Sequence, residues 1–419
     1  MKNIPLFKYF VFALLIAVPL AMSGKKQKVA RPSTRTVSVG NASASERIPG
    51  APDFAYPQTV SKASEKDLDA ALMSGNEKGA VRALMNYCLA QAQIGSDNYP
   101  EVIEKITTVG SKLKAPQSKS LVNTLLADIY VAIFNNNSYV YNNRKLPLLP
   151  VPEDFNEWSG DQFRHVITNL SKESMADAIA LQTTPLNEYS NIIDCETSSR
   201  VYFPTLYDFV AYKAIGNMQQ IGQFSSCFGL LSLSPRSVFS VSPVLVMNSP
   251  QAQLITDTYA ALLRFHKGNA APEIYAEIQR IDFAEDNVYY NLSDKAKLTA
   301  VDRLMDLYND YKNNEYSGNV LIALQRYINE NPNSKISKKE NYNLLQQFKS
   351  KYPSFARIGC IDNIISNLSG VSFSVFTPQI VAPSQDFKLS IRGNNANSVT
   401  VDIFNVSGIS SRESQIKAS

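Results

Sequence analysis

The chain has 419 residues, of which 44% are hydrophobic, so it is long enough to form two or three domains with a buried core. Its net charge of +4 comes from one end, because residues 1–36 hold seven basic and no acidic side chains. The rest is slightly acidic, which excludes a nucleic-acid-binding body, and the composition excludes a disordered chain, a collagen, a coiled coil and a polytopic membrane protein.

The first 23 residues have the pattern of a secretory signal peptide. Two lysines precede an apolar run over residues 9–22, which is shorter than the roughly 20 residues that a membrane span needs. Ala21 and Ser23 are the small residues expected before a cleavage site between Ser23 and Gly24. We therefore expect an exported protein with no membrane span in the mature chain; an uncleaved anchor is the alternative.

Residues 24–60 are rich in Lys, Ser, Pro and Gly and hold few large apolar side chains. This composition predicts a flexible basic tether. Its basic start could make a peripheral contact with anionic lipid head groups. A solvated linker is the alternative.

Residues 61–369 are predicted to form a helical domain, because apolar residues recur at three- and four-residue spacing. Ser64 and Asp67 have the spacing of a capping box, which predicts a helix start at Ser64. Helices with short connections lie antiparallel, so we predict irregular stacked helical hairpins, tetratricopeptide-like but without a fixed 34-residue repeat. The segments are 64–75, 80–92, 102–109, 121–133, 159–181, 204–209, 251–266, 271–281, 294–311, 317–331, 337–351 and 356–368.

Two regions within the helical domain interrupt this periodicity. Residues 136–160 hold Asn, Pro and Tyr together with the only tryptophan, which predicts a loop. Residues 227–250 are apolar and rich in Ser and Pro without a clear period, so no element is predicted there.

At Gly370 the period of the apolar residues changes to two. Three short strands are predicted over residues 371–375, 387–391 and 399–403, separated by Pro and Gly. A seven-stranded sandwich needs about 100 residues, so residues 370–419 are expected to form a partial antiparallel β-sandwich. The expected fold class is therefore mainly α, followed by an incomplete β domain.

The four cysteines are too few and too scattered to form a disulfide framework. Export implies an oxidising compartment, and Cys195 and Cys227, which flank one segment, are the favoured pair. The alternative is that all four are small buried side chains. None stands in a CxxC motif, which excludes a redox motif or zinc ribbon of that kind.

The sequence holds none of the common catalytic or nucleotide-binding motifs, since HExxH, GxSxG, GxxxxGK[ST] and GxGxxG are all absent. His165 and His266 are expected to lie on the surface or to interact with the C-terminal dipole of a helix. Carboxylate pairs at helical spacing, such as Glu101 and Glu104, are typical of solvated helix faces. We expect neither enzymatic activity nor a cofactor or metal.

Several ordered blocks of sequence carry a family resemblance. They resemble the N-terminal part of the large alpha-2-macroglobulin-family proteins of Bacteroidetes, and the strand segment looks like the start of the first macroglobulin domain. The most specific block is PTLYDFVA at residues 204–211. The other blocks are residues 64–72, 97–103, 261–266, 280–283 and 371–406.

The resemblance implies an exported protein of a Gram-negative envelope, periplasmic or associated with the cell surface. The family traps proteases after cleavage of a bait segment, and some members form a thioester in a Cys-x-Glu-Gln motif. No cysteine of this chain stands in that motif, and the bait segment and later sandwiches are absent. We therefore expect the N-terminal portion of such a protein, from a fragmentary or split reading frame. It would be inactive as an inhibitor alone and would meet a protease or an envelope protein through the full-length protein.

The alternative is a free-standing helical-repeat protein of the envelope that binds a glycan or a protein partner. Tyr139 and Tyr141 of the predicted loop could stack on sugars, although packing is a simpler explanation in a chain with 21 tyrosines. Exported glycan-binding helical proteins of this bacterial group usually carry a lipid-modified cysteine after the signal, and this chain has none.

Overall fold

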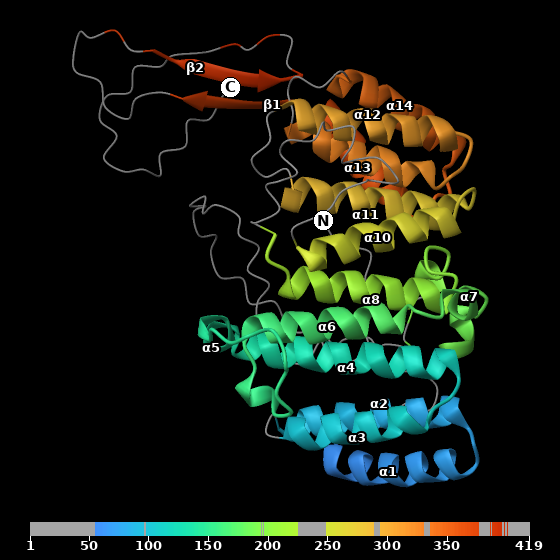
Figure 1. Cartoon of the computed structure of the whole chain (residues 1–419). Helices are drawn as coiled ribbons and strands as arrows, with labels where there is room; N and C mark the ends of the chain where they lie inside the picture. Colours follow the sequence, from blue (N-terminus) through green and yellow to red (C-terminus); the bar gives the residue numbers. More distant parts are fainter. Residues whose placement is uncertain are drawn as a thin grey trace, which may run out of the picture. The chain divides into compact units, whose positions relative to one another are not determined.

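The computed structural model describes residues 55–95, 98–193, 195, 197–224, 249–288, 294–330, 336–376, 386, 388–395, 398 and 400. These residues are mainly helical, with one two-stranded antiparallel sheet among them (Figure 1). The chain divides into two compact units, and the boundary lies between Lys335 and Ile336. No helix in the described part of the chain is long and apolar enough to cross a membrane.

The first unit is built from helices joined mostly by short connections, as the sequence predicts. Three short 3-10 helices, η2 (Phe155–Glu157), η3 (Leu186–Tyr189) and η4 (Thr197–Ser199), lie in the connections before α8. The α-helices are α1 (Pro57–Met73), α2 (Glu77–Ile94), α3 (Tyr99–Lys112), α4 (Pro116–Asn136), α5 (Ser138–Asn143), α6 (Gly160–Ser174), α7 (Ala178–Gln182), α8 (Leu206–Ile221), α10 (Pro250–Phe265), α11 (Ala270–Val288), α12 (Asp294–Tyr311) and α13 (Ser317–Glu330).

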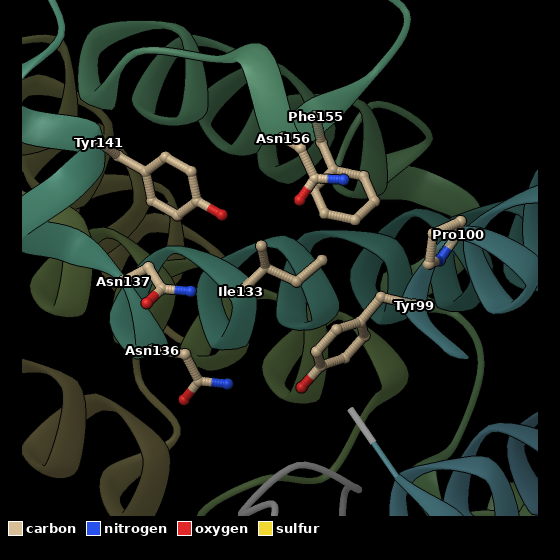
Figure 2. Close-up of a pocket in the computed structure, with 8 residues that line it drawn as sticks. All are labelled: Tyr99, Pro100, Ile133, Asn136, Asn137, Tyr141, Phe155 and Asn156. Carbon is tan, nitrogen blue, oxygen red and sulfur yellow. The ribbon is translucent and has the colours of Figure 1, made fainter. Parts of the chain in front are cut away.

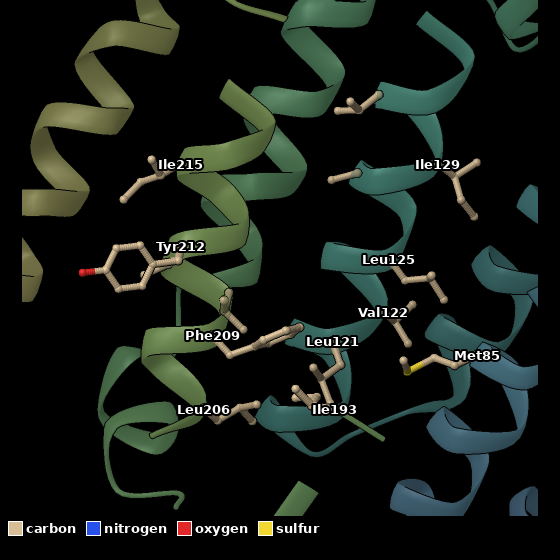
Figure 3. Packing of buried hydrophobic residues seen from close by; sticks show 14 of the residues in the cluster. Met85, Leu121, Val122, Leu125, Ile129, Ile193, Leu206, Phe209, Tyr212 and Ile215 are labelled. Atoms are coloured by element: carbon tan, nitrogen blue, oxygen red, sulfur yellow. The ribbon is translucent and has the colours of Figure 1, made fainter. Parts of the chain in front are cut away.

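Helix α4 lies inside this unit and packs against α2, α3, α6 and α8. It is apolar on more than one side, as expected of a helix with neighbours around it. Figure 3 shows Val122 and Leu125 on the side of α2, near Met85, whereas Leu121 lies near Phe209 of α8. Helices α10 to α13 continue the packing along the chain, each against its sequence neighbour.

The start of the first helix differs from the prediction. Helix α1 begins at Pro57, seven residues before Ser64, so the predicted capping box is wrong. Proline suits the first turn because its fixed φ is helical and its missing N–H has no partner to lose there. Ser64 is instead buried on the inner face of the helix.

Two further boundaries differ around the predicted loop. Residues 138–143 form the short helix α5 inside it. The helix predicted over 159–181 is split, because α6 ends at Ser174 and α7 begins at Ala178. Ser159, the first residue of the predicted segment 159–181, is the cap of α6, and Gln162 closes its capping box.

The second unit consists of α14 (Lys338–Lys351), α15 (Ile358–Ser369) and the antiparallel hairpin of β1 (Ser372–Phe376) and β2 (Ser390–Asn394). Val375 of β1 pairs with Ile391 of β2. After β2, the Asn395 side chain donates to the backbone carbonyl of Leu368 at 2.6 Å, which ties the end of the hairpin to α15. All five side chains of β1 are exposed.

Several sequence predictions fall outside the described residues. They are the signal peptide with its cleavage site between Ser23 and Gly24, the tether up to residue 54, and Cys227. The third predicted strand, residues 399–403, also lies there except for Thr400.

Candidate functional site

An open cleft of about 400 Å³ lies in the first unit where α3, α4, α5 and η2 meet. Figure 2 shows side chains from all four elements around it. The lining residues are Tyr99, Pro100, Ile133, Asn136, Asn137, Tyr141, Phe155 and Asn156. The volume is in the lower part of the range usual for small-molecule sites.

Local chain geometry brings the amide side chains of the cleft together. Helix α4 ends at Asn136, and Asn137 leads directly into α5, where its carbonyl accepts from the Tyr141 N–H at 3.2 Å. Asn156 comes from a different segment. Its backbone N–H donates to the Asp154 carboxylate at 2.9 Å, which caps η2 and fixes the turn.

An aromatic cluster supports the floor of the cleft. The ring of Tyr141 lies 4.5 Å from that of Phe163, and Phe155 packs edge-on against Tyr130. Trp158 lies 5.0 Å from Tyr130. Because these rings are buried, the cleft is preformed on a rigid base.

Arg144 connects the parts of the site. Its guanidinium donates to the carbonyl oxygens of Asn156 and of Trp158, the latter at 3.0 Å. The same group lies 5.3 Å from the centre of the Tyr141 ring. One side chain therefore links η2 to α5.

The lining of the cleft is uncharged at neutral pH. Burial raises the pKa of Tyr99, and the nearby polar side chain of Asn136 opposes this only in part. Burial also raises the pKa of Tyr141, against the nearby positive charge of Arg144. Both phenols therefore stay protonated and can donate as well as accept hydrogen bonds.

The exposed rim and the buried floor of the cleft differ in chemistry. Asn136, Asn137 and Asn156 are exposed, whereas Ile133 and Tyr141 are buried. Figure 2 shows the Tyr141 hydroxyl directed into the cleft. The arrangement can bind a neutral polar ligand by hydrogen bonds above an apolar floor, and its lining holds no paired nucleophile and base.

The two tyrosines singled out in the sequence have different positions. Tyr139 is exposed on α5, whereas Tyr141 lines the cleft. Because the Tyr141 ring packs against Phe163, its hydroxyl and not its ring face is offered to a ligand. Stacking on a sugar through Tyr141 is therefore not available.

The predicted disulfide stays a prediction. Cys195 is buried in the loop before η4, and Cys227 lies outside the described residues. Cys88 is also buried, which raises the pKa of its thiol, whereas Cys360 is exposed.

Of the two positions expected for His266, the surface is wrong, whereas a place at the C-terminus of a helix agrees with the structure, because His266 is the C-cap residue of α10. Its side chain is 3% exposed, and its Nε2 lies 2.5 Å from the Asp208 carboxylate. The other oxygen of Asp208 accepts from the backbone N–H and the hydroxyl of Thr205, at 2.9 and 2.7 Å. This Thr205–Asp208–His266 clasp ties the start of α8 to the end of α10. Because the hydroxyl donates to the carboxylate and not to the imidazole, the clasp is a structural contact and no nucleophile–base pair.

His165 is half-buried on α6, with its Nε2 3.1 Å from the Asn169 side chain. Within the described ranges, no group of three or more His, Cys, Asp or Glu side chains could hold a metal ion. Comparisons with protein families, with curated proteins and with solved structures found no match. Function is therefore inferred from the chemistry of the cleft.

Proposed function

We propose that the helical unit is a binding module that holds a neutral glycan in the cleft beside α5. The observation that carries this is the rim of three exposed amides, Asn136, Asn137 and Asn156, above an apolar floor. The side-chain N–H₂ of Asn156 donates once to the Asp154 carboxylate at 3.0 Å and keeps its second N–H and its carbonyl oxygen for a ligand. Amides offer donors and an acceptor, which match neighbouring sugar hydroxyls. A charged ligand would lose its hydration without gaining a partner of opposite charge among the lining residues.

The size of the cleft also favours a glycan over a protein partner. A stable protein interface buries about 800 Å² on each partner and has an apolar core. The cleft is small, and exposed amides surround its apolar floor. It fits one or two sugar rings better than a folded protein surface.

The test is binding of the full chain to an array of neutral oligosaccharides, followed by calorimetry with the sugar that binds. Asn136→Ala and Asn156→Ala are each expected to weaken binding about fivefold, the equivalent of one hydrogen bond. Asn187→Ala is the matched control, because Asn187 is exposed on η3 and does not line the cleft. A blank array with an intact circular dichroism spectrum, or an equal loss in the control, would contradict the proposal.

We further propose, from the family resemblance, that the chain is part of an exported alpha-2-macroglobulin-like protein of a Gram-negative envelope. The hairpin β1–β2 supports this because Phe373 and Val375 of β1, and Val371 just before it, are exposed, as expected of apolar side chains that further sandwich strands would cover. This chain is expected neither to trap proteases alone nor to act as an enzyme.

The gene sequence after codon 419 tests this second proposal. Continuation into further sandwich domains is expected. A stop codon with no macroglobulin sequence downstream in any frame would contradict it.

A further inference from the structure

Exposed apolar side chains form a second surface feature, close in the sequence to the residues that line the cleft. Within residues 139–149, five large apolar side chains are exposed, including Tyr139 at 82% and Leu149 at 61%. Such a concentration of exposed apolar side chains marks an interaction site. The other three exposed side chains are Val140, Leu146 and Leu148. We call residues 146–152 the leucine loop.

The leucine loop is held in place by two buried side chains. Gln162 donates to the carbonyl of Pro147 at 2.9 Å, and the Trp158 indole N–H donates to the carbonyl of Pro152 at 2.7 Å. Gln162 and Trp158 are both buried. The exposure of the leucines is therefore built into the fold and is not a consequence of a loose chain.

The backbone of the leucine loop has fewer polar groups to desolvate than a loop without proline. Three of its seven residues are prolines, which have no N–H to desolvate. The carbonyls of Pro147 and Pro152 accept hydrogen bonds from Gln162 and Trp158. The carbonyl oxygen of Pro150 lies 3.4 Å from the side-chain nitrogen of Gln162. The N–H groups of the other four residues, Leu146, Leu148, Leu149 and Val151, would still have to leave water, but the loop has three fewer N–H groups to desolvate than a segment without proline, which lowers the cost of entering lipid.

We propose that the leucine loop inserts into the surface of a lipid bilayer. Leu146, Leu148 and Leu149 would enter the boundary between head groups and acyl chains, and Tyr139 would lie at the interface, where amphipathic rings are favoured. This goes beyond the cleft and does not depend on which ligand the cleft binds.

The charged residues beside the leucine loop indicate whether insertion would need anionic lipid. Arg144 and Lys145 precede the leucine loop, and Glu153 and Asp154 follow it, so its flanks are balanced. Insertion is therefore driven by apolar area and needs no anionic lipid. Contact through the basic tether would behave in the opposite way, requiring anionic lipid and weakening with salt.

The test places a reporter in the loop of the full chain. Leu149→Trp gives the chain a second tryptophan beside the native Trp158. The emission of Trp158 in the wild type is the baseline that is subtracted. With vesicles of phosphatidylcholine alone, the added emission is expected to shift to shorter wavelength and to be quenched by brominated phosphatidylcholine. Adding Leu148→Ser should raise the lipid concentration at half-effect at least fivefold.

Ile179→Trp is the matched control, because Ile179 is 81% exposed on α7, away from the loop. Its emission should not change with vesicles. The proposal is overturned if the Leu149→Trp emission stays unshifted, if its shift needs phosphatidylglycerol or disappears in high salt, or if Ile179→Trp responds equally. It is also overturned if the emission is already shifted without lipid in a concentration-dependent way, because a second copy would then cover the loop.

Discussion

Glu277→Gln is predicted to destabilise the first unit by about 3 kcal/mol. The Glu277 side chain is 1% exposed, and its carboxylate accepts from Arg280 of the same helix at 2.7 and 2.8 Å. It also accepts from Arg303 of α12 at 2.7 Å, so it joins two helices. Removing one partner of a buried ion pair costs about 3–5 kcal/mol. The lower value applies because glutamine keeps one acceptor oxygen and Arg303 reaches solvent.

The loss of unfolding free energy in Glu277→Gln should depend on pH. Burial alone would raise the pKa of Glu277, but the hydrogen bonds and charges of Arg280 and Arg303 outweigh it and hold the pKa below its ordinary value. Since the folded-state pKa is depressed, the stabilisation is present above the unfolded value of about 4.3 and is lost as the pH falls through the folded value. The difference between wild type and variant should therefore shrink in acid.

Urea unfolding of the full chain, followed by circular dichroism, measures the difference. The control is Glu65→Gln, because Glu65 pairs with Lys105 at 2.8 Å and both side chains are about one third exposed. An exposed pair contributes less than about 1 kcal/mol. If the two substitutions cost the same, or if the Glu277 cost does not change in acid, the assignment of a buried ionic link between α11 and α12 is refuted.

Three further predictions concern the ends of the chain, the cysteines and the clasp. N-terminal sequencing of the exported chain should begin at Gly24, and a chain that retains Ser23 would contradict the predicted signal peptide. A thiol titration of the unfolded, unreduced protein should find only two of the four thiols, because Cys195 and Cys227 are predicted to pair; four would refute that pair. His266→Ala should cost about 2 kcal/mol by the same urea assay, because it opens a buried contact to a carboxylate, and a loss no larger than the surface control would contradict this.

Helix positions followed from the sequence where local chemistry decides them. Helix α12 has the predicted bounds, residues 294–311, and α6 begins at Gly160, one residue after the predicted start of the segment 159–181. In these segments the spacing of the apolar residues, or the residue at the cap, is enough to locate the helix. Ser64 misled because a serine that packs on the inner face of a helix has the same sequence spacing as a cap, and only the packing against α2 distinguishes the two.

The cleft could not be predicted in the same way. Asn136 and Asn156 are separated by a loop whose path depends on the Arg144 contacts and on the buried rings beneath it. The run Asn135-Asn136-Asn137 at the end of a helix was the one local signal. His266 shows the same limit, because its burial depends on Asp208, which lies 58 residues away in the chain.

The cleft and the leucine loop share the hydrogen bonds of Arg144, which relates the two proposals. Arg144 holds the carbonyls of Asn156, on the rim of the cleft, and of Trp158, whose indole anchors the loop at Pro152. A displacement of the loop in a bilayer would therefore reach Asn156 through three hydrogen bonds, Pro152–Trp158, Trp158–Arg144 and Arg144–Asn156. Such coupling is reciprocal, so a ligand that fixes Asn156 would also bias the position of the loop.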